Sequence, residues 1–309
     1  MEQLERLAQT LRTGWPELEL REHEPMSRHT TFRIGGPARL MALPRDRKEA
    51  AAAVRAAAEL GIRPFFLGNG SNLLVAARGY EGFIVKLTGL DQTRVVNRRL
   101  RAESGISLAR LAMAAWGCGL TGLEFAHGIP GTLGGGVAMN AGAYGGEMSQ
   151  VLTAVTFLDE AGQVITLPAQ ECALTYRHSL FTDHPERLIL EAEFELAQGV
   201  PTLIKIRMDE LAQKRRAKQP LDQPSAGSTF KRPEGHFAAA LIEQCGLKGL
   251  SVGGAQVSEK HAGFVVNRGG ATAEDVLRLM EQVRERVLRD TGVELEPEDN
   301  SYQEGSVFG

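Results

Sequence analysis

The stretch GIPGTLGGGVAMNAGAYGG, residues 128–146, combines eight glycines with several large apolar side chains and no charge. A flexible linker would be polar, and a core segment would contain less glycine. Pro130 fixes the direction in which the chain enters, and a short helix starting near Thr132 would point free amides and a positive dipole end at a phosphate. Two interpretations stay open: a phosphate cradle, or close backbone packing of two elements.

A second glycine-containing stretch, LGNGSNLLV (67–75), has the pattern of a strand, a tight turn and another strand. Gly68 and Gly70 allow a positive φ, and the polar residues Asn69, Ser71 and Asn72 offer donors beside exposed amides. Such a turn forms a nest for an anion, or it is an ordinary hairpin turn. Together the two stretches favour a dinucleotide cofactor that is held by backbone amides.

Other nucleotide-binding patterns are excluded. The glycines of GCGLTG (117–122) match G-x-G-x-x-G, but they follow the helical pattern 107–117 and not a strand. We therefore interpret them as a helix cap and an exit turn, and the cofactor frame is not of the Rossmann type. The chain contains no G-x-x-x-x-G-K-[ST] sequence, so P-loop phosphoryl transfer has no support.

Composition narrows the class of protein further. The 309 residues carry a net charge of −3, which gives no sign of a nucleic-acid partner. Three scattered cysteines form neither a disulfide framework nor a metal-ligand pair, so no metal site is expected and a reducing compartment fits best. The start of the chain lacks the apolar region of a signal peptide, and no run is long enough to span a membrane. We expect a cytoplasmic protein.

Periodicity predicts an α+β chain with irregular alternation of helices and strands. The helical patterns begin with residues 1–15, whose apolar face comprises Leu4, Leu7, Ala8 and Leu11. The other helices are expected at 43–62, 107–117, from about 203 to 217, at 236–246 and from Thr272 onward. The strands are expected at 63–68, 72–76, 82–87, 94–105, 187–196 and 262–267, with a hairpin over 154–167.

The last helix carries the clearest local signals. Thr272 stands at the cap and Asp275 at the capping-box position. The apolar stripe that follows comprises Val276, Leu279, Met280, Val283 and Val287.

Six motifs in order extend over residues 30–298 and resemble UDP-N-acetylenolpyruvoylglucosamine reductases. They are TTFRIGGPA (30–38), LGNGSNLLV (67–75), GLEFAHGIPGTLGGGVAMNAGAYGGEM (122–148), YRHSLF (176–181), GSTFKRP (227–233) and LEPE (295–298). The resemblance implies an FAD-binding fold of the vanillyl-alcohol-oxidase (PCMH) type, with a separate α+β C-terminal substrate domain. It also implies non-covalent FAD, NADPH as electron donor and reduction of an enolpyruvyl ether of a UDP-sugar in bacterial wall synthesis.

The resemblance, with a composition shift at 197–202, predicts an N-terminal helical segment over 1–32 and an FAD-binding domain of two subdomains over 33–197. A substrate domain over 198–309 follows, whose tail is expected to return to the active site. Between Glu195 and Lys205 there is no room for the inserted tyrosine loop of the family's longer form, so the chain resembles the shorter form. We expect a monomer.

The resemblance also implies roles for individual residues. Arg177 matches the arginine that binds the substrate carboxylate, Ser228 the proton donor and Glu298 the acid that works with Arg177. Relatives continue with an apolar strand after this glutamate, whereas this chain continues DNSYQEG, so the anchoring of Glu298 stays open. The residues that match substrate contacts are Tyr144, Tyr176, Lys218, Arg232 and His261. The cofactor contacts are expected at Gly68, Asn69, Gly70, Ser71, Asn72, Leu73, Gly128, Ile129, Pro130, Gly131, Thr132, Gly134, Gly135, Asn140, Ala141, Gly142 and Ile189.

Two other functions stay open at this point. One is a different FAD oxidoreductase of the same fold, which would act on a hydroxy acid or sugar with oxygen as acceptor and would not need Arg177, Ser228 and Glu298 together. The other is a nucleotide-sugar or flavin-binding module without catalysis.

Overall fold

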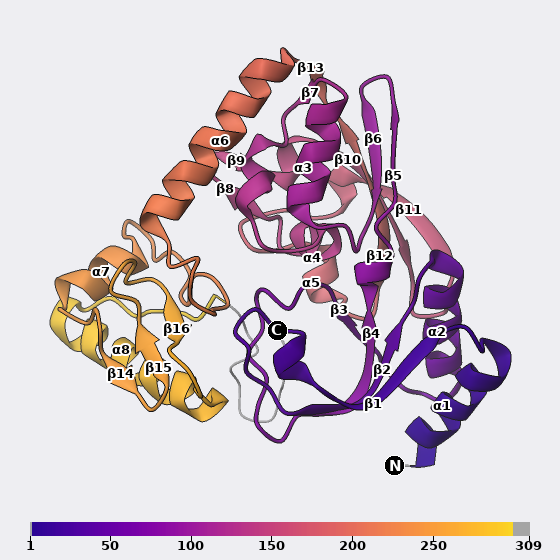
Figure 1. Cartoon of the computed structure of the whole chain (residues 1–309), viewed down its shortest axis with the longest axis horizontal. Helices are drawn as coiled ribbons and strands as arrows, with labels where there is room; N and C mark the ends of the chain where they lie inside the picture. Colours follow the sequence, from indigo (N-terminus) through magenta and orange to yellow (C-terminus); the bar gives the residue numbers. More distant parts are fainter. Residues whose placement is uncertain (1, 299–309) are drawn as a thin grey trace. The chain divides into compact units, whose positions relative to one another are not determined.

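The computed structural model describes residues 2–298 of the chain (Figure 1). These residues form two compact units. The first unit comprises 2–22, 39–69 and 81–214, and the second comprises 23–38, 70–80 and 215–298. The helix α6 (Pro201–Lys218) contains the last change from one unit to the other. The domain boundaries at 32/33 and 197/198 stay a prediction, and the tail proposed to return to the active site (299–309) lies outside the described residues.

A five-stranded antiparallel sheet forms the centre of the first unit (Figure 1). Its order is β11-β10-β12-β6-β5, with β5 Thr93–Val96, β6 Arg99–Glu103, β10 Leu152–Leu158, β11 Val164–Pro168 and β12 Leu188–Glu195. The hairpin predicted over 154–167 is confirmed as β10 and β11. The strand predicted over 94–105 is instead a hairpin, because Asn97 takes a positive φ of 56° between β5 and β6.

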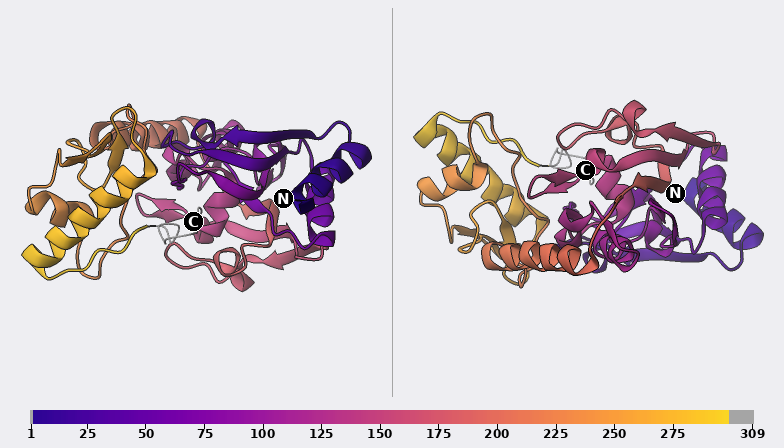
Figure 2. Two further views of the ribbon diagram at one scale, coloured as in Figure 1. Left: turned by 90° about the horizontal axis from the view of Figure 1, so that it is seen from below. Right: turned by 90° about the horizontal axis from the view of Figure 1, so that it is seen from above.

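Two cores of the first unit meet at β12, because successive side chains of a strand point to opposite faces. Ile189 lies in the core beneath α3 (Leu108–Gly117) and α4 (Leu133–Ala138). Leu188 and Leu190 belong to the other core, with α1 (Glu2–Gly14) and α2 (Arg47–Glu59). The two N-terminal helices lie side by side in both views of Figure 2, and the predicted face of α1 is buried at Leu7, Ala8 and Leu11.

A four-stranded sheet of order β1-β2-β4-β3 lies under these N-terminal helices. Its strands are β1 Glu19–Pro25, β2 Pro37–Leu43, β3 Phe65–Leu67 and β4 Tyr80–Lys86. β3 pairs in parallel with β4, with Phe65 opposite Ile84. The hairpin interpretation of LGNGSNLLV is therefore wrong, and residues 72–76 form no strand.

The segment after β3 has no regular secondary structure, because contacts with residues distant in the chain hold it. Leu74 enters the core of the second unit, and Val75 lies against Gly35. The N–H of Gly36 donates to the carbonyl of Ala76 at 3.0 Å, and a Cβ on Gly36 would lie 2.0 Å from the carbonyl oxygen of Ala77. The paired glycines of TTFRIGGPA therefore allow this backbone contact.

In the second unit, α7 (Ala238–Gln244) and α8 (Ala273–Thr291) pack with a three-stranded sheet (Figures 1 and 2). The strands are β14 Ser251–Val252, β15 Ala255–Val257 and β16 Val265–Asn267. The predicted start of α8 is confirmed: Thr272 Oγ1 accepts the N–H of Asp275, and the carboxylate of Asp275 accepts the N–H of Thr272. All five residues of the predicted apolar stripe are buried.

Short elements connect these layers. They are β7 Leu120–Thr121, β8 Gly142–Ala143, β9 Gly146–Glu147, β13 Ala197–Gln198 and α5 Leu180–Asp183, with 3₁₀ helices at Met26–Arg28, Leu87–Gly89, Glu124–Gly128, Met148–Gln150 and Ala169–Glu171. Gly119 follows α3 with a φ of 68°, which confirms the exit turn at GCGLTG. β12 ends at Glu195 and α6 begins at Pro201, so the described chain has no inserted loop there. Within residues 2–298, no helix is long and apolar enough to cross a membrane.

Candidate active site

The helix predicted in the glycine-rich stretch is present as α4, which begins directly after Thr132. The expectation that all its first amides are free is wrong. The N–H groups of Leu133 and Gly134 donate to carbonyl oxygens in residues 104–106, at 2.9 and 2.7 Å. These two bonds tie the start of α4 to the chain between β6 and α3.

The third helical amide, that of Gly135, is different. Gly135 is exposed, and its N–H donates to no acceptor in the described part of the chain. A Cβ built on it would have only Thr132 Oγ1 nearby, at 4.0 Å. Gly135 is therefore a position in the first turn of α4 where a ligand can approach the backbone.

Close packing explains a different glycine of the predicted cradle. A Cβ on Gly68 would lie 2.1 Å from Thr132 Oγ1, so the turn after β3 touches the start of α4. The side-chain amide of Asn69 donates to the carbonyl of Pro130 at 3.3 Å. The two interpretations of the glycines thus hold at different positions: Gly68 serves packing, and Gly135 is open.

The turn over residues 69–72 leaves a run of backbone donors. Gly70 has a φ of 59°, and a Cβ there would lie 2.2 Å from the carbonyl oxygen of His29. The N–H groups of residues 69–72 have no acceptor among residues 2–298. Successive amides of this kind are typical of an anion-binding nest.

Two buried polar atoms beside the glycine-rich stretch support a polar ligand there. Ser104 Oγ and His127 Nδ1 are buried and have no hydrogen-bond partner among the described residues. Ser104 lies against Gly134, and His127 directly precedes Gly128. Buried polar groups are nearly always paired, so these two atoms fit a site that a bound group completes.

The other predicted cofactor residues fall into two groups. The side chains of Leu73, Asn140 and Ile189 are buried at 3%, 2% and 6% exposure. Those of Ser71 and Asn72, with the backbone of Gly128, Ile129, Gly131, Ala141 and Gly142, are partly exposed, and Pro130 is exposed. The buried side chains of the first group can only support the surface of a ligand site from beneath. The residues of the second group are accessible to a ligand.

Arg177 lies in a tight turn that places strain on its backbone. Thr175 and His178 bond to each other through both N–H groups, at 3.0 and 3.3 Å, and the two residues between them form the turn. Arg177, the second of the two, has a φ of 55°, a conformation that glycine or asparagine normally supplies. Its guanidinium lies 5.2 Å from the ring centroid of Tyr176, which is exposed.

Tyr144 occupies a second strained turn. It has a φ of 54° and is followed by Gly145 at 86°, so both residues between β8 and β9 are left-handed, as in a type I′ hairpin. Asparagine, aspartate and glycine are usual at the first of these positions. The tyrosine ring is 42% exposed at the tip of the hairpin.

Glu298 is bonded to Thr229, the residue that follows Ser228 in the chain. The N–H of Glu298 donates to the carbonyl of Thr229 at 2.9 Å, and Phe230 pairs with Pro297 as an isolated bridge. Thr229 is itself held, because its N–H donates to Gly263 and its Oγ1 accepts from the N–H of Val265. Glu298 is 8% exposed, so residues before the polar tail anchor it.

The remaining predicted substrate residues also lie in the second unit. Lys218 ends α6 and is exposed, and the guanidinium of Arg232 stacks 3.9 Å from the ring centroid of Phe237. Burial lowers the pKa of His261 below its ordinary value of 6.5, and the charges of Lys248 and Lys218 lower it further. Since His261 Nδ1 accepts the N–H of Gly263, the ring is the neutral Nε2–H tautomer.

Sequence reasoning missed the residues that hold these turns. Ser179 is fully buried, caps α5 and donates from Oγ to the carbonyl of Ala138 at 2.6 Å. The serine before the apolar pair Leu180–Phe181 is the cap signal that marks it. Thr229 carries no local signal, because its partners are distant in the chain. Ser104 and His127 carry none either, because only the fold shows that their side-chain atoms are buried without a partner.

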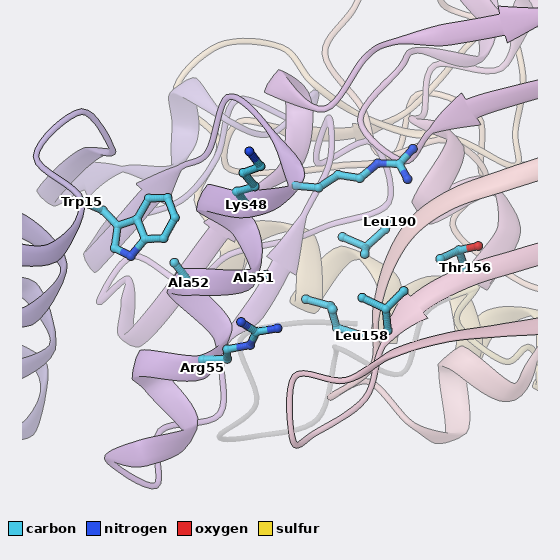
Figure 3. Close-up of a pocket in the computed structure, with 10 residues that line it drawn as sticks. Trp15, Lys48, Ala51, Ala52, Arg55, Thr156, Leu158 and Leu190 are labelled. Carbon is cyan, nitrogen blue, oxygen red and sulfur yellow. The ribbon is translucent and has the colours of Figure 1, made fainter.

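A cavity of about 390 Å³ is lined by residues other than the predicted site residues (Figure 3). It is lined by Trp15, Arg47, Lys48, Ala51, Ala52, Arg55, Thr156, Leu158, Val164 and Leu190. Arg47 is paired with Glu103 and Glu191, and Arg55 donates to the carbonyl of Gly162. The cavity contains none of the predicted site residues. Within residues 2–298 no cluster of potential metal ligands occurs.

Comparison with known proteins identifies the domains and the family of the chain. Residues 38–168 match the family model of an FAD binding domain, and residues 219–301 match that of the C-terminal domain of UDP-N-acetylenolpyruvoylglucosamine reductase. The chain is 48% identical over 295 residues to the UDP-N-acetylenolpyruvoylglucosamine reductase of Caldanaerobacter subterraneus subsp. tengcongensis, covering 96% of both chains. It is 47% identical over 281 residues to that of Latilactobacillus sakei subsp. sakei, covering 91% of this chain and 92% of the relative.

The chain belongs to the UDP-N-acetylenolpyruvoylglucosamine reductase family. A crystal structure of UDP-N-acetylenolpyruvylglucosamine reductase from Thermus caldophilus has a TM-score of 0.77 to it at 34% identity, over 91% of this chain and 97% of the other. The expected fold, an α+β reductase fold with an FAD-binding domain and a separate C-terminal domain, is thereby confirmed.

Proposed function

We propose that this reductase-family protein reduces UDP-N-acetylglucosamine enolpyruvate to UDP-N-acetylmuramate with electrons from NADPH and non-covalently bound FAD. The observation that supports the proposal is the hydrogen bond from the N–H of Glu298, a buried acid, to the carbonyl of Thr229, the residue that follows the exposed Ser228. Reduction of an enolpyruvyl double bond needs a proton donor at one carbon and stabilisation of the charge that develops beside it. A hydroxyl residue and an acid on two hydrogen-bonded segments would fit that need.

Bound FAD would supply the hydride that adds to the methylene carbon of the enolpyruvyl group, with NADPH as the source of its electrons. The residues that would hold its phosphates are the unbonded amides of 69–72 and the exposed amide of Gly135. Ser104 Oγ and His127 Nδ1 are the buried donors or acceptors that a bound group would complete. Gly68 and Asn69 hold the turn after β3 against the start of α4 by contacts within the protein alone.

Arg177 would bind the carboxylate of the substrate and stabilise the negative charge that develops on the α-carbon and spreads into it. Ser228 would give its hydroxyl proton to the α-carbon, so that one hydride and one proton add across the double bond. Glu298 would act with Arg177 on the carboxylate. Tyr144, Tyr176, Lys218, Arg232 and His261 would contact the remainder of the UDP-sugar or the nicotinamide nucleotide.

The proposal includes the biological setting that the reaction implies. The product is a precursor of peptidoglycan, so the enzyme would serve cell-wall synthesis and, through it, cell shape and division. We place it in the cytoplasm as a monomer that binds no nucleic acid or membrane. Its domains would be those expected from the sequence, with the substrate-binding domain from residue 198 onward.

The test is a pair of separate half-reactions. The purified protein, loaded with FAD, is mixed anaerobically with NADPH and then with UDP-N-acetylglucosamine enolpyruvate, while flavin absorbance near 450 nm is followed. Bleaching and then prompt reoxidation by the enolpyruvate supports the proposal. If the enolpyruvate does not reoxidise the flavin and only oxygen admitted afterwards does, the result would favour the other FAD oxidoreductase. Failure to bind FAD would contradict both enzyme functions. Ser228→Ala should leave bleaching nearly intact and slow reoxidation by substrate.

A further inference from the structure

Two buried polar side chains connect the turn that carries Arg177 to the end of the glycine-rich stretch. Asn140 Nδ2 donates to the carbonyl of Thr175 at 3.1 Å, two residues before Arg177. Ser179 Oγ donates to the carbonyl of Ala138 at 2.6 Å, two residues after it. The turn is therefore held on both sides by residues 138–140, all within the first unit.

Both side chains are buried, and each makes a second hydrogen bond within the protein. Asn140 is 2% exposed, and its Oδ1 also accepts the N–H of Ser149 at 2.9 Å. Ser179 is 0% exposed, and its Oγ also accepts the N–H of Phe181. A cofactor contact at Asn140 would thus come from its backbone, since both polar atoms of its side chain bond within the protein.

The strain at Arg177 explains why such anchors are needed. A left-handed conformation costs an arginine of the order of 1 kcal/mol, and it persists only where the surroundings determine it. The two bonds between Thr175 and His178 close the turn, but they do not orient it on the protein. The hydrogen bonds from Asn140 and Ser179 orient the turn, because they attach it to the glycine-rich stretch that begins at Gly128.

We infer that Asn140 and Ser179 are positioning residues for Arg177, which set where the guanidinium meets the substrate carboxylate without touching the substrate themselves. The inference rests on the proposed function. Misplacing a charged group by about 1 Å is enough to slow a reaction on the order of 100-fold. Loss of either anchor should therefore act on the step that needs Arg177 and spare the step that does not.

The primary variant is Asn140→Asp, which keeps the size, the left-handed tolerance and the acceptor for Ser149 but removes the donor to Thr175. Asn97→Asp is the matched control, because Asn97 also has a positive φ of 56° and lies exposed in the β5–β6 turn. We expect Asn140→Asp to slow reoxidation by substrate about 10- to 100-fold and to change flavin reduction by NADPH less than about 2-fold. The control should change neither step.

A double-mutant cycle decides whether the effect passes through Arg177. In an Arg177→Ala background, Asn140→Asp should cause no further slowing of reoxidation. Additive losses, equal loss of both half-reactions, or no loss at all would overturn the inference. Ser179→Ala, which removes the second anchor with little change in volume, serves as the second variant with the same expectations.

Hydrogen exchange gives a readout that does not depend on activity. Asn140→Asp and Ser179→Ala should increase exchange at the amides of Thr175 and His178 at least several-fold, whereas Asn97→Asp should not. If the wild-type protein fails to be reoxidised by the enolpyruvate, the proposed function is wrong, but the exchange data still test the anchoring. Unchanged exchange in both variants would refute the anchoring itself.

Discussion

Three of the residues to which the proposed reaction assigns a role have a left-handed backbone. Asn140, Tyr144 and Arg177 all have positive φ values, between 41° and 55°. Such conformations persist at functional sites when a side chain is needed more than a relaxed backbone. At Tyr144 and Arg177 the residue that would suit the turn best differs from the residue present, which allows function and stability to be separated by substitution.

For Tyr144, replacement by asparagine is expected to stabilise the fold. Asn-Gly is the preferred pair of a type I′ turn, so Tyr144→Asn should raise the free energy of unfolding by up to about 1 kcal/mol. The same change removes an exposed ring that the proposal assigns to the substrate, so KM for the UDP-sugar should rise about 10-fold. Denaturant unfolding and steady-state kinetics measure the two effects. Tyr144→Phe, which keeps the ring and the strain, is the control, and a loss of stability in Tyr144→Asn would contradict the argument.

For Arg177, asparagine is again the residue that the turn prefers. Relief of the left-handed strain, about 1 kcal/mol, offsets the loss of the contact with Tyr176, which is of similar size. Arg177→Asn should therefore change the free energy of unfolding by less than about 1 kcal/mol. Reoxidation of flavin by substrate should fall about 10²–10³-fold, as for loss of one charge-stabilising group. A protein that unfolds or loses FAD instead would show that Arg177 is structural.

At the scale of elements, the glycines that were predicted to contact the cofactor divide into those that serve packing and those that leave the backbone open. Gly70 lies against the carbonyl of His29 with a positive φ, whereas Gly135 has open space beside it in α4. Both residues were predicted as cofactor contacts from the same sequence signal. Only the atoms around the two glycines distinguish them, and an alanine substitution tests whether there is space for a methyl group at each position.

Alanine at these two positions should have opposite effects on the apoprotein. Gly70→Ala should lower the free energy of unfolding by about 2–4 kcal/mol, because strain adds to the clash with backbone. Gly135→Ala should raise it by about 0.5–1 kcal/mol, since alanine favours the helix, and should weaken FAD binding about 10-fold. Thermal unfolding without FAD and FAD titration measure these changes. Equal destabilisation by both substitutions would show that Gly135 is also closely packed.

Local signals predicted the elements whose partners are near in sequence. The capping box and apolar stripe of α8 and the β10–β11 hairpin need only residues a few positions apart, and all were predicted. The strand expected at 72–76 was wrong because Val75 packs against Gly35 and β3 pairs with β4 in parallel. The continuous apolar run from Leu73 to Ala76 packs in more than one place, and a short apolar run cannot be distinguished from a buried strand by periodicity.

At the scale of the whole molecule, His261 makes stability depend on pH. Burial lowers its pKa in the folded state, so below about pH 6.5 the unfolded chain binds more protons than the folded one. The contribution of neutral His261 to stability is therefore present above its ordinary pKa and is lost as the pH falls. His261→Gln, which has no titrating group, should flatten this loss. Denaturant unfolding of both proteins between pH 7.5 and 5.5 measures it, and identical pH profiles would contradict the assignment.

The sequence by itself determined the family, the cofactor class and most helices, because ordered motifs, caps and periodicity are written in short stretches. Only the tertiary structure decided how the site is held. It showed that Leu133 and Gly134 use their amides within the protein, that Thr229 anchors Glu298, and that Asn140 and Ser179 hold the turn of Arg177. These contacts join segments that lie far apart in the chain, and their hydrogen bonds depend on how the elements pack. Such packing leaves no periodic trace in a single sequence.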